Sequence, residues 1–334
     1  MALLIAFSLA LVLALILTPL GVRLAWASGY LDHPEARKLH TSATALLGGS
    51  VVFVSALLSW LLLSGRPSNP PSSALCILGG AITILTVGLW DDRFTLGVRV
   101  KLVGQVAASA LLLASGRIPD LGLPQAGNFI ATMVALVALM NAVNFLDNMN
   151  GMVSGLSAIA LVGFAWGSAE RGEFGVAAAQ LALAGACAGF LRYNFPKAKI
   201  FLGDAGSLLL GYSLGASAVL AFTGLPRGWG QAGPILALAY PTFDMIFVVV
   251  NRVREGRPIS QGGKDHSNHR LARIIQCQKR TVILIWLVGA ALSASALAVQ
   301  KLNSALPTLI LLALWVTIFL LAGLRLSSID PQGP

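Results

Sequence analysis

Long apolar stretches recur along the chain, separated by short polar segments. Each is close to the length of about 20 residues that a helix needs to cross about 30 Å of hydrocarbon. The first stretch has no basic residue before it, so we expect a retained helix rather than a cleaved signal peptide. About eleven spans are predicted, at residues 2–22, 45–64, 73–90, 98–116, 128–145, 152–168, 174–191, 205–223, 231–251, 280–299 and 303–325.

Composition supports this pattern. Hydrophobic residues make up 56% of the chain, the mean hydropathy is +0.80, and only 11% of residues are charged. A soluble globular domain typically carries about 25% charged residues. The sequence therefore predicts an all-α polytopic membrane protein in which residues 1–334 form a single transmembrane domain.

The net charge of +10 is distributed according to this topology. When the loops alternate between the two sides, starting with the amino terminus outside, 18 of the 23 basic residues fall inside. That asymmetry is typical of inner-membrane proteins, and it predicts a cytoplasmic carboxyl terminus. It also argues against nucleic acid as a partner. The expected cytoplasmic segments lie near residues 23–44, 91–97, 146–151, 192–204 and 252–279.

Four polar motifs interrupt the apolar pattern, and each contains an aspartate. They are Trp90-Asp91-Asp92, Asn144-Phe145-Leu146-Asp147-Asn148, Phe201-Leu202-Gly203-Asp204 and Lys264-Asp265-His266. All four fall on the predicted inside, although the chain has only 13 acidic residues. We therefore expect a single site at the boundary between membrane and cytoplasm.

Lys101 and Gln105 follow Asp91 and Asp92 and share a helix face, because they are four residues apart. A lysine in a span costs about 2.5–3.5 kcal/mol, so Lys101 is expected to face a partner or a wet cavity. The alternative is that both aspartates are solvated loop charges and that Lys101 reaches the membrane surface.

Asn141, Asn144 and Asp147 also recur at helical spacing and lead into Asn150-Gly151. Their oxygens suit Mg²⁺ or the hydroxyl groups of a nucleotide. A plain helix end followed by a turn is the weaker interpretation, because two asparagines one turn apart in a lipid span are costly.

Two interpretations of Asp204 remain open. It could cap the helix that begins there, or it could bind a metal while Gly203 and Gly206 let backbone amides approach a phosphate. Asn194 precedes this motif.

The basic loop at 252–280 contains Asp265, His266, His269 and Arg270. Anionic lipid could account for the charge alone. The two histidines have the spacing of a metal pair, but further zinc ligands are missing, so phosphate binding is favoured. Asp244, inside a predicted span, is expected to pair with a basic residue, for which the following loop is a source.

The early loop Arg37-Lys38-Leu39-His40 adds two cations and an imidazole, and a topology signal is its simplest interpretation. The motifs in order resemble the polyprenyl-phosphate N-acetylhexosamine-1-phosphate transferase family. The match runs over Arg37-Lys38-x-His40, Gly48-Gly49, Asp91-Asp92 with Lys101 and Gln105, Asn141 to Gly151, Asn194 to Ser207, and Asp265-His266-x-x-His269-Arg270.

The resemblance implies transfer of a sugar 1-phosphate from a UDP-N-acetylhexosamine to a polyprenyl phosphate, with release of UMP and a need for Mg²⁺, or Mn²⁺ in its place. This would be the first membrane step of a cell-envelope glycan. The histidine loop is closer to the branch that uses simple UDP-N-acetylhexosamines than to the phospho-MurNAc-pentapeptide branch. Two positions differ from the family: Asn150 stands where an aspartate is common, and Ala45 replaces a proline.

The resemblance also implies residue roles. Asp204 would bind Mg²⁺, with Asp91 and Asp147 as further candidate ligands. The catalytic candidates are Asp91, Asp92, Asp147 and His266. The substrate-binding candidates are Lys38, Lys101, Asn141, Asn144, Asn150, Asn194, His269 and Arg270. One-step and covalent two-step routes both stay open.

Two other functional classes fit part of this pattern. An ion-coupled transporter or lipid flippase could use the same carboxylates, but its site is expected near the membrane midplane. A scaffold gives no reason to gather these side chains on one side. Two Gly-x-x-x-Gly motifs, beginning at Gly185 and Gly211, would allow a homodimer, although packing within the monomer is favoured.

Overall fold

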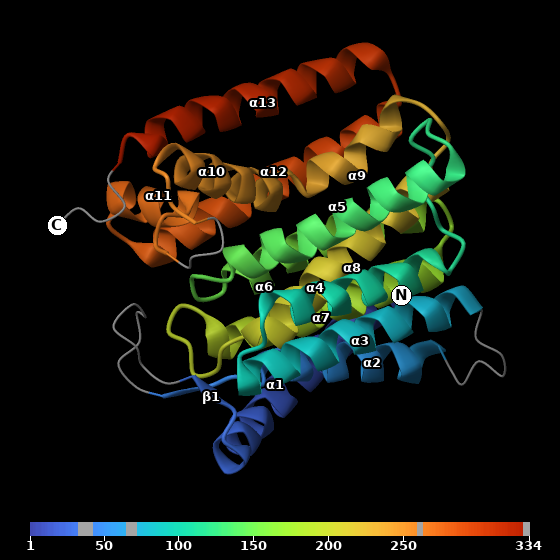
Figure 1. The fold of residues 1–334 in the computed structure, drawn as a ribbon. Helices are drawn as coiled ribbons and strands as arrows, with labels where there is room; N and C mark the ends of the chain where they lie inside the picture. Colours follow the sequence, from blue (N-terminus) through green and yellow to red (C-terminus); the bar gives the residue numbers. More distant parts are fainter. Residues whose placement is uncertain (33–42, 65–71, 259–262, 330–334) are drawn as a thin grey trace. The chain divides into compact units, whose positions relative to one another are not determined.

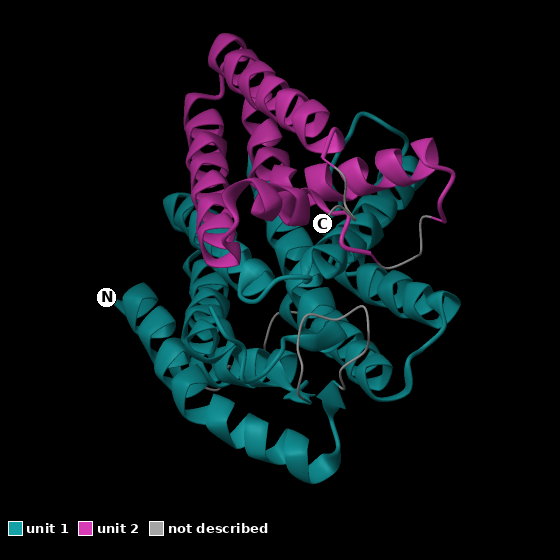
Figure 2. Ribbon diagram, turned by 90° about the vertical axis from the view of Figure 1, so that its left-hand side faces the viewer, with its two compact units in different colours: residues 1–225 teal, residues 226–334 magenta. Residues whose placement is uncertain are grey.

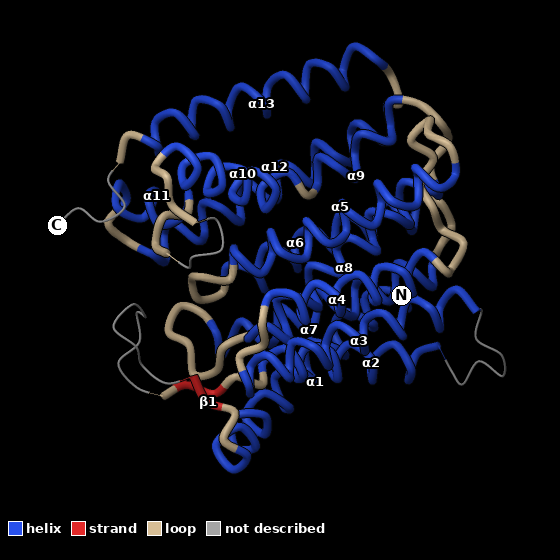
Figure 3. The backbone as a smooth tube through the Cα atoms, viewed as in Figure 1, coloured by secondary structure: helices blue, strands red, loops and turns tan. Residues whose placement is uncertain are grey.

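The computed structural model describes residues 1–32, 43–64, 72–258 and 263–329, and they form helices joined by short loops, with one small pair of strands (Figures 1 and 3). The candidate residue Lys38 lies outside the described residues, as do Arg37 and His40. The chain divides into two compact units, unit 1 (residues 1–225) and unit 2 (residues 226–334), which Figure 2 colours separately.

Unit 1 contains most of the predicted spans. Its elements are α1 (Ala2–Ser28), β1 (Leu31–Asp32), β2 (Thr44–Ala45), α2 (Gly48–Ser64), α3 (Ser72–Phe94), α4 (Val98–Leu113), α5 (Gln125–Leu146), α6 (Met152–Glu170), α7 (Phe174–Asn194) and α8 (Gly203–Gly224). The two short strands pair antiparallel. Every predicted span in this unit corresponds to a helix, with ends that differ by a few residues.

Unit 2 begins with a broken helix. Its elements are η1 (Trp229–Gln231), α9 (Ala232–Ala237), α10 (Ala239–Arg254), α11 (Ser267–Ile275), α12 (Gln278–Leu302) and α13 (Ala305–Ser327). The segments Trp229–Ala237 and Ala239–Arg254 meet at 65°, within the stretch predicted as one span at 231–251. Pro241 accounts for the break, because proline has no amide hydrogen to donate to Ala237 and its ring crowds that carbonyl.

The all-α polytopic class is confirmed. Within the described ranges, eight helices are long and apolar enough to cross a membrane, or nine if the bent pair counts as one span. Helices α2 and α4, with 17 and 16 residues, fall short of that length. The count of eleven spans and their orientation stay predictions.

Glycines allow the helices of unit 1 to pack closely. A Cβ at Gly185 or Gly189 of α7 would meet the backbone carbonyls of Phe7 and Leu11 on α1. A Cβ at Gly211 of α8 would lie 2.8 Å from the Met140 backbone on α5. Both Gly-x-x-x-Gly motifs therefore serve packing inside unit 1, as favoured from the sequence.

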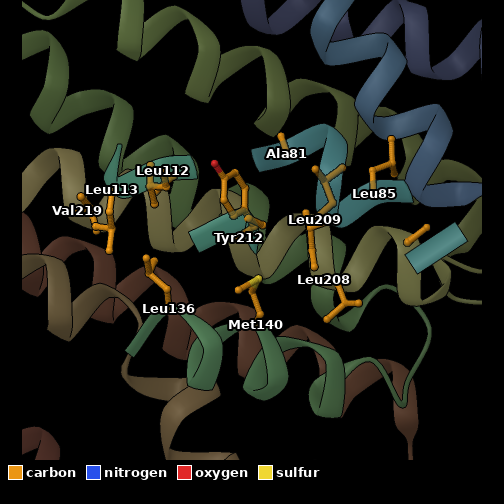
Figure 4. Packing of buried hydrophobic residues seen from close by; sticks show 14 residues of the cluster. Ala81, Leu85, Leu112, Leu113, Leu136, Met140, Leu208, Leu209, Tyr212 and Val219 are labelled. Atoms are coloured by element: carbon orange, nitrogen blue, oxygen red, sulfur yellow. The ribbon is translucent and has the colours of Figure 1, made fainter. Parts of the chain in front are cut away.

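An apolar core lies among α3, α4, α5 and α8. Leu112, Met140, Leu208 and Tyr212 are almost completely buried in it (Figure 4). The Tyr212 hydroxyl donates to the Ile77 carbonyl at 2.8 Å, so its polar end is satisfied. These four helices also carry the polar residues described next, so the core holds the helix ends in register.

Candidate functional site

Glycine contacts bring α2 and α3 directly against the N-terminus of α8. A Cβ at Gly49 would meet the backbone of Gly206, and one at Gly88 would meet the backbone of Ala205. The Gly49 amide donates to the Leu202 carbonyl at 2.9 Å. The Gly48-Gly49 motif and Gly206 thus serve helix packing here, and the approach of backbone amides to a phosphate stays a prediction.

Lys101 is at the centre of the polar cluster at this end of unit 1. Its Nζ lies 2.5 Å from Asp91 Oδ2 on α3 and 2.6 Å from Asp204 Oδ2 on α8. Asp91 is only 8% exposed, and its other oxygen accepts the Leu96 amide at 2.6 Å. The expectation that Lys101 faces a partner is confirmed, and the alternative of solvated loop charges is wrong.

Asn144 of α5 supplies the second contact to Asp204. Its Nδ2 donates to Asp204 Oδ1 at 3.0 Å and to Ser207 Oγ at 2.8 Å. One turn earlier, Asn141 Nδ2 donates to Gln105 Oε1 at 2.7 Å, and Gln105 Nε2 donates back at 3.3 Å. Asn141 therefore joins α5 to α4.

Asp92 points to a different target from its neighbour. Its Oδ1 accepts the Asp204 amide at 2.7 Å, and its Oδ2 accepts the Ala205 amide at 3.1 Å. Helix α8 begins after Leu202, which makes no side-chain capping bond. The interpretation of Asp204 as the helix cap is therefore wrong, because Asp92 of α3 supplies the capping oxygens.

Asp147 directly follows α5 and is half-buried. Within the part of the chain that the structure describes, its carboxylate has no hydrogen-bond donor. Burial, together with the negative charge of Asp204, raises the pKa of Asp147 to about 7. A cation beside these two carboxylates would favour the ionised form of both.

Asn194 and Asn150 connect the loop after α5 to the loop before α8. Asn194 Oδ1 accepts the Gly151 amide at 2.8 Å, and its Nδ2 donates to the Ile200 carbonyl at 2.9 Å. Asn150 Nδ2 donates to the Pro196 carbonyl at 3.0 Å. Gly151 has φ +75°, a conformation that glycine adopts at little cost. The side chains of both asparagines therefore bind backbone groups of these loops.

A second polar network lies in unit 2. His266 Nδ1 is 2.8 Å from Asp244 Oδ2, and both side chains are buried. The other oxygen of Asp244 accepts the amide and the hydroxyl of Ser267, at 2.8 and 2.6 Å. The expected pairing of Asp244 with a basic residue of the following loop is confirmed.

Asp265 is buried beside Arg252, which donates to both carboxylate oxygens at 2.8 Å. Burial alone would raise the pKa of Asp265, but the hydrogen bonds and charge of Arg252 outweigh it and hold that pKa well below its usual range. Burial, and secondly the charge of His266, lower the pKa of His269 to about 4. His269 is therefore neutral at pH 7.

Arg270 is 1% exposed and takes a structural position. Its Nη1 donates to the carbonyls of Leu326 and Ser327 at 3.2 Å and of Ile329 at 2.8 Å, so it caps the end of α13. These surroundings give no support to phosphate binding by Arg270, which stays a prediction.

Sequence reasoning missed Ser207 and Ser267. Ser207 lies three residues after Asp204 on the same helix face, which was the available signal. Ser267 follows His266 directly, but its bond to Asp244 spans 23 residues and only the fold shows it.

The acidic residues of unit 1 provide the number of oxygen donors that a Mg²⁺ site needs from a protein. Among the described residues, no group of three or more histidine, cysteine, aspartate or glutamate side chains could hold a metal ion. Mg²⁺, however, usually binds through one or two carboxylates, with substrate phosphates and water completing its shell. Asp204 and Asp147 provide that number of hard oxygen donors, so they fit this mode of binding.

Comparison with known proteins identifies the family and several relatives of this chain. The model of glycosyl transferase family 4 matches residues 74–222. A probable undecaprenyl-phosphate N-acetylglucosaminyl 1-phosphate transferase of Bacillus subtilis is 31% identical over an alignment of 309 positions, which covers 89% of this chain and 85% of that protein. A decaprenyl-phosphate N-acetylglucosaminephosphotransferase of Mycolicibacterium smegmatis is 31% identical, covering 78% of this chain and 72% of that protein. A phospho-N-acetylmuramoyl-pentapeptide-transferase of Desulforudis audaxviator is 28% identical, covering 89% and 96%.

Proposed function

The chain belongs to glycosyl transferase family 4, and from this premise we propose that it transfers N-acetylhexosamine 1-phosphate from a UDP-sugar to polyprenyl phosphate and releases UMP. The chain is an enzyme of the phosphotransferase type, as its relatives are named. Those relatives are named for undecaprenyl or decaprenyl phosphate and for N-acetylglucosamine. The donor sugar proposed here follows from those names.

The observation that carries this proposal is the cluster of Asp91, Lys101, Asn144 and Asp204. Four different helices contribute one residue each, and all four side chains are joined through contacts of 2.5–3.0 Å. Phosphoryl transfer depends on positioning and on charge neutralisation more than on covalent chemistry of the protein. Lys101 lies between the Asp91 and Asp204 carboxylates, and the Asn144 amide also binds Asp204, so the cluster provides fixed charges of both signs.

We propose the following roles. A phosphate oxygen of the polyprenyl phosphate attacks the phosphorus next to the sugar, and the bond from that phosphorus to UMP breaks. The acceptor is mostly a dianion at neutral pH, because its second pKa is about 6, so a strong base is not required. Lys101 would donate to a phosphate oxygen, while Asp91 holds its ammonium group in place.

Mg²⁺ would be held by Asp204 and Asp147, with Asp91 as a further candidate and Mn²⁺ as an alternative ion. When bound, the ion would neutralise the diphosphate of the donor. Asn144 orients the Asp204 carboxylate for this purpose. In unit 2, we propose that His266 and His269 bind phosphate, with Asp244 fixing the orientation of the His266 ring.

The proposed location and assembly rest on the sequence. The excess of basic residues in one set of loops supports an inner-membrane protein with its site on the cytoplasmic face. A homodimer stays a prediction, since the glycine motifs that suggested it pack within unit 1.

The test is UMP release by the purified protein from a panel of UDP-N-acetylhexosamines, with polyprenyl phosphate and Mg²⁺. Activity should need both substrates and be abolished by a chelator. Asp204→Asn should reduce the rate at least 100-fold, whereas Asp120→Asn, a change of an exposed acidic residue, should have no effect. Absence of UMP release with every donor, or full activity of Asp204→Asn, would refute the proposal.

A further inference from the structure

Asp91 and Asp92 are adjacent in the sequence but have separate contacts. Asp91 faces the Lys101 ammonium at 2.5 Å. Asp92 has both oxygens on backbone amides at the start of α8, at 2.7 and 3.1 Å. The two carboxylates therefore cannot be treated as one acidic pair.

The two amides that Asp92 accepts are the ones that a capping residue normally satisfies. Helix α8 starts at Gly203, so Asp204 and Ala205 occupy its second and third positions. An N-cap side chain accepts a hydrogen bond from one of these positions. Leu202, the residue at the N-cap position of α8, has no polar side chain to do so. The cap thus comes from another helix, 112 residues earlier in the chain.

The local packing is built around this contact. Gly88 is one turn before Asp92 on α3, and a Cβ there would meet the Ala205 backbone, so the glycine permits the close approach. Gly203 has φ +74°, and a Cβ at this position would lie 2.5 Å from Asp92 Oδ2. Gly88 therefore lets α3 approach α8 closely, and Gly203 leaves room for the Asp92 carboxylate between the two helices.

The same contact fixes Asp204. The Asp204 amide is bound by Asp92, while its side chain is bound by Lys101 and Asn144. Backbone and carboxylate of one residue are thus fixed by three other helices. The negative charge of Asp92 also lies at the positive end of the helix dipole, where it is favourable.

We infer that Asp92 is a positioning residue, which holds the first turn of α8 so that the Asp204 carboxylate is oriented for its cation, and that it does not act on the substrate. The cation role of Asp204 rests on the proposed function. The capping contact between Asp92 and α8 does not rest on that function, so the two proposals can be tested separately.

The first experiment is hydrogen exchange of the peptide that contains residues 203–207, measured by mass spectrometry on the purified protein in detergent. Asp92→Asn should accelerate exchange of this peptide about fivefold or more, because asparagine has a single acceptor oxygen for the two amides and one hydrogen bond of about 1 kcal/mol is lost. Asp91→Asn is the matched control and should leave these amides unchanged, because Asp91 contacts Lys101 and Leu96. Equal exchange in wild type and Asp92→Asn would overturn the inference.

The second experiment separates positioning from direct catalysis. The Mg²⁺ concentration for half-maximal UMP release should rise at least tenfold in Asp92→Asn, and saturating Mg²⁺ should restore most of kcat. Asp204→Asn should not be restored. A large loss of kcat in Asp92→Asn with unchanged Mg²⁺ dependence would overturn the inference, because it would indicate direct action on the substrate.

Gly88→Ala provides an independent variant that leaves all acidic residues in place. The added methyl group meets backbone, so α3 must move away from α8 and Asp92 loses its contacts. It should reproduce the exchange and Mg²⁺ phenotypes of Asp92→Asn. Normal exchange in this variant would contradict the inference. Faster exchange in both variants, with a wild-type protein inactive on every donor, would support the cap and refute the proposed function.

Discussion

Lys101 is the single residue on which the charge balance of the unit 1 cluster depends. Its ammonium group contacts two carboxylates that would otherwise face each other in a largely buried place. Removing one partner of a buried ion pair is costly because it leaves the other charge uncompensated. Lys101 is therefore expected to be less replaceable than any exposed lysine.

Lys101→Met tests this expectation. We expect UMP release to fall about 100-fold or more and thermal stability in detergent to decrease, since Asp91 and Asp204 lose their common partner. Lys301→Met, an exposed lysine of unit 2, is the control and should behave like wild type. Wild-type activity of Lys101→Met would show that the cluster is not the reaction centre.

His269 gives a second prediction at the residue scale, and it concerns pH. Because the pKa of His269 is lowered to about 4 in the folded protein, the unfolded chain binds a proton first as the pH falls. This contribution to stability is complete above about pH 6.5 and is lost progressively between about 6.5 and 4. The melting temperature should fall over that window, and His269→Gln should reduce the slope. A melting temperature with the same pH dependence in both proteins would contradict this expectation.

Which charged residues need a partner could be predicted from the sequence, whereas the identity of a partner far away in the chain could not. The need of Lys101 and of Asp244 for partners follows from the cost of burying a charge, so both were expected. That Lys101 lies between Asp91 and Asp204 depends on a contact across 103 residues. No periodicity or spacing in the sequence specifies such a contact.

At the scale of elements, the amide pair of Gln105 and Asn141 sets the alignment of α4 and α5. Lys101 lies one turn before Gln105, and Asn144 lies three residues after Asn141. The pair is therefore the connection between the two helices nearest to the Asp204 contacts. Sliding one helix would move Lys101 or Asn144 away from Asp204.

A double-mutant cycle tests this connection. Gln105→Leu and Asn141→Leu should each reduce stability by about 1–3 kcal/mol, because each removes the hydrogen bonds between the two side chains from an amide that is buried (Gln105) or half-buried (Asn141). The double variant should lose less than the sum of the two. Ser109→Ala, which removes only a local bond to the Gln105 carbonyl, is the control with a small effect. Additive losses in chemical unfolding would exclude the coupling.

Helices themselves were the most predictable feature, because their apolar stretches are long and bounded by polar loops. The exceptions have local causes that a hydropathy pattern does not contain. The span at 231–251 breaks at Leu238 because Pro241 cannot complete the helix. The cap of α8 comes from Asp92, so the sequence around Asp204 could not distinguish a capping role from a ligand role.

At the scale of the whole molecule, the orientation in the membrane is a prediction that can be tested in each unit. The predicted orientation rests on the distribution of basic residues, with 18 in the segments predicted inside and 5 in those predicted outside. Helix α12, with 25 residues, is about 37 Å long at 1.5 Å per residue, enough to cross the hydrocarbon core. Its two ends carry exposed lysines, Lys279 and Lys301.

These two lysines allow a direct test. In a variant without Cys76, Cys187 and Cys277, we expect Lys301→Cys to react with a membrane-impermeant maleimide in intact spheroplasts and Lys279→Cys to react only after the membrane is disrupted. The physical reason is that basic loops are retained on the cytoplasmic side. Reaction of Lys279→Cys alone would reverse the orientation. Equal reaction of both before disruption would mean that α12 does not cross.

Asp120→Cys and Lys197→Cys repeat the comparison in unit 1, with Lys197→Cys expected to stay protected. Agreement between the units is required if the Asp204 and His266 motifs both face the cytoplasm, as the distribution of basic residues predicts.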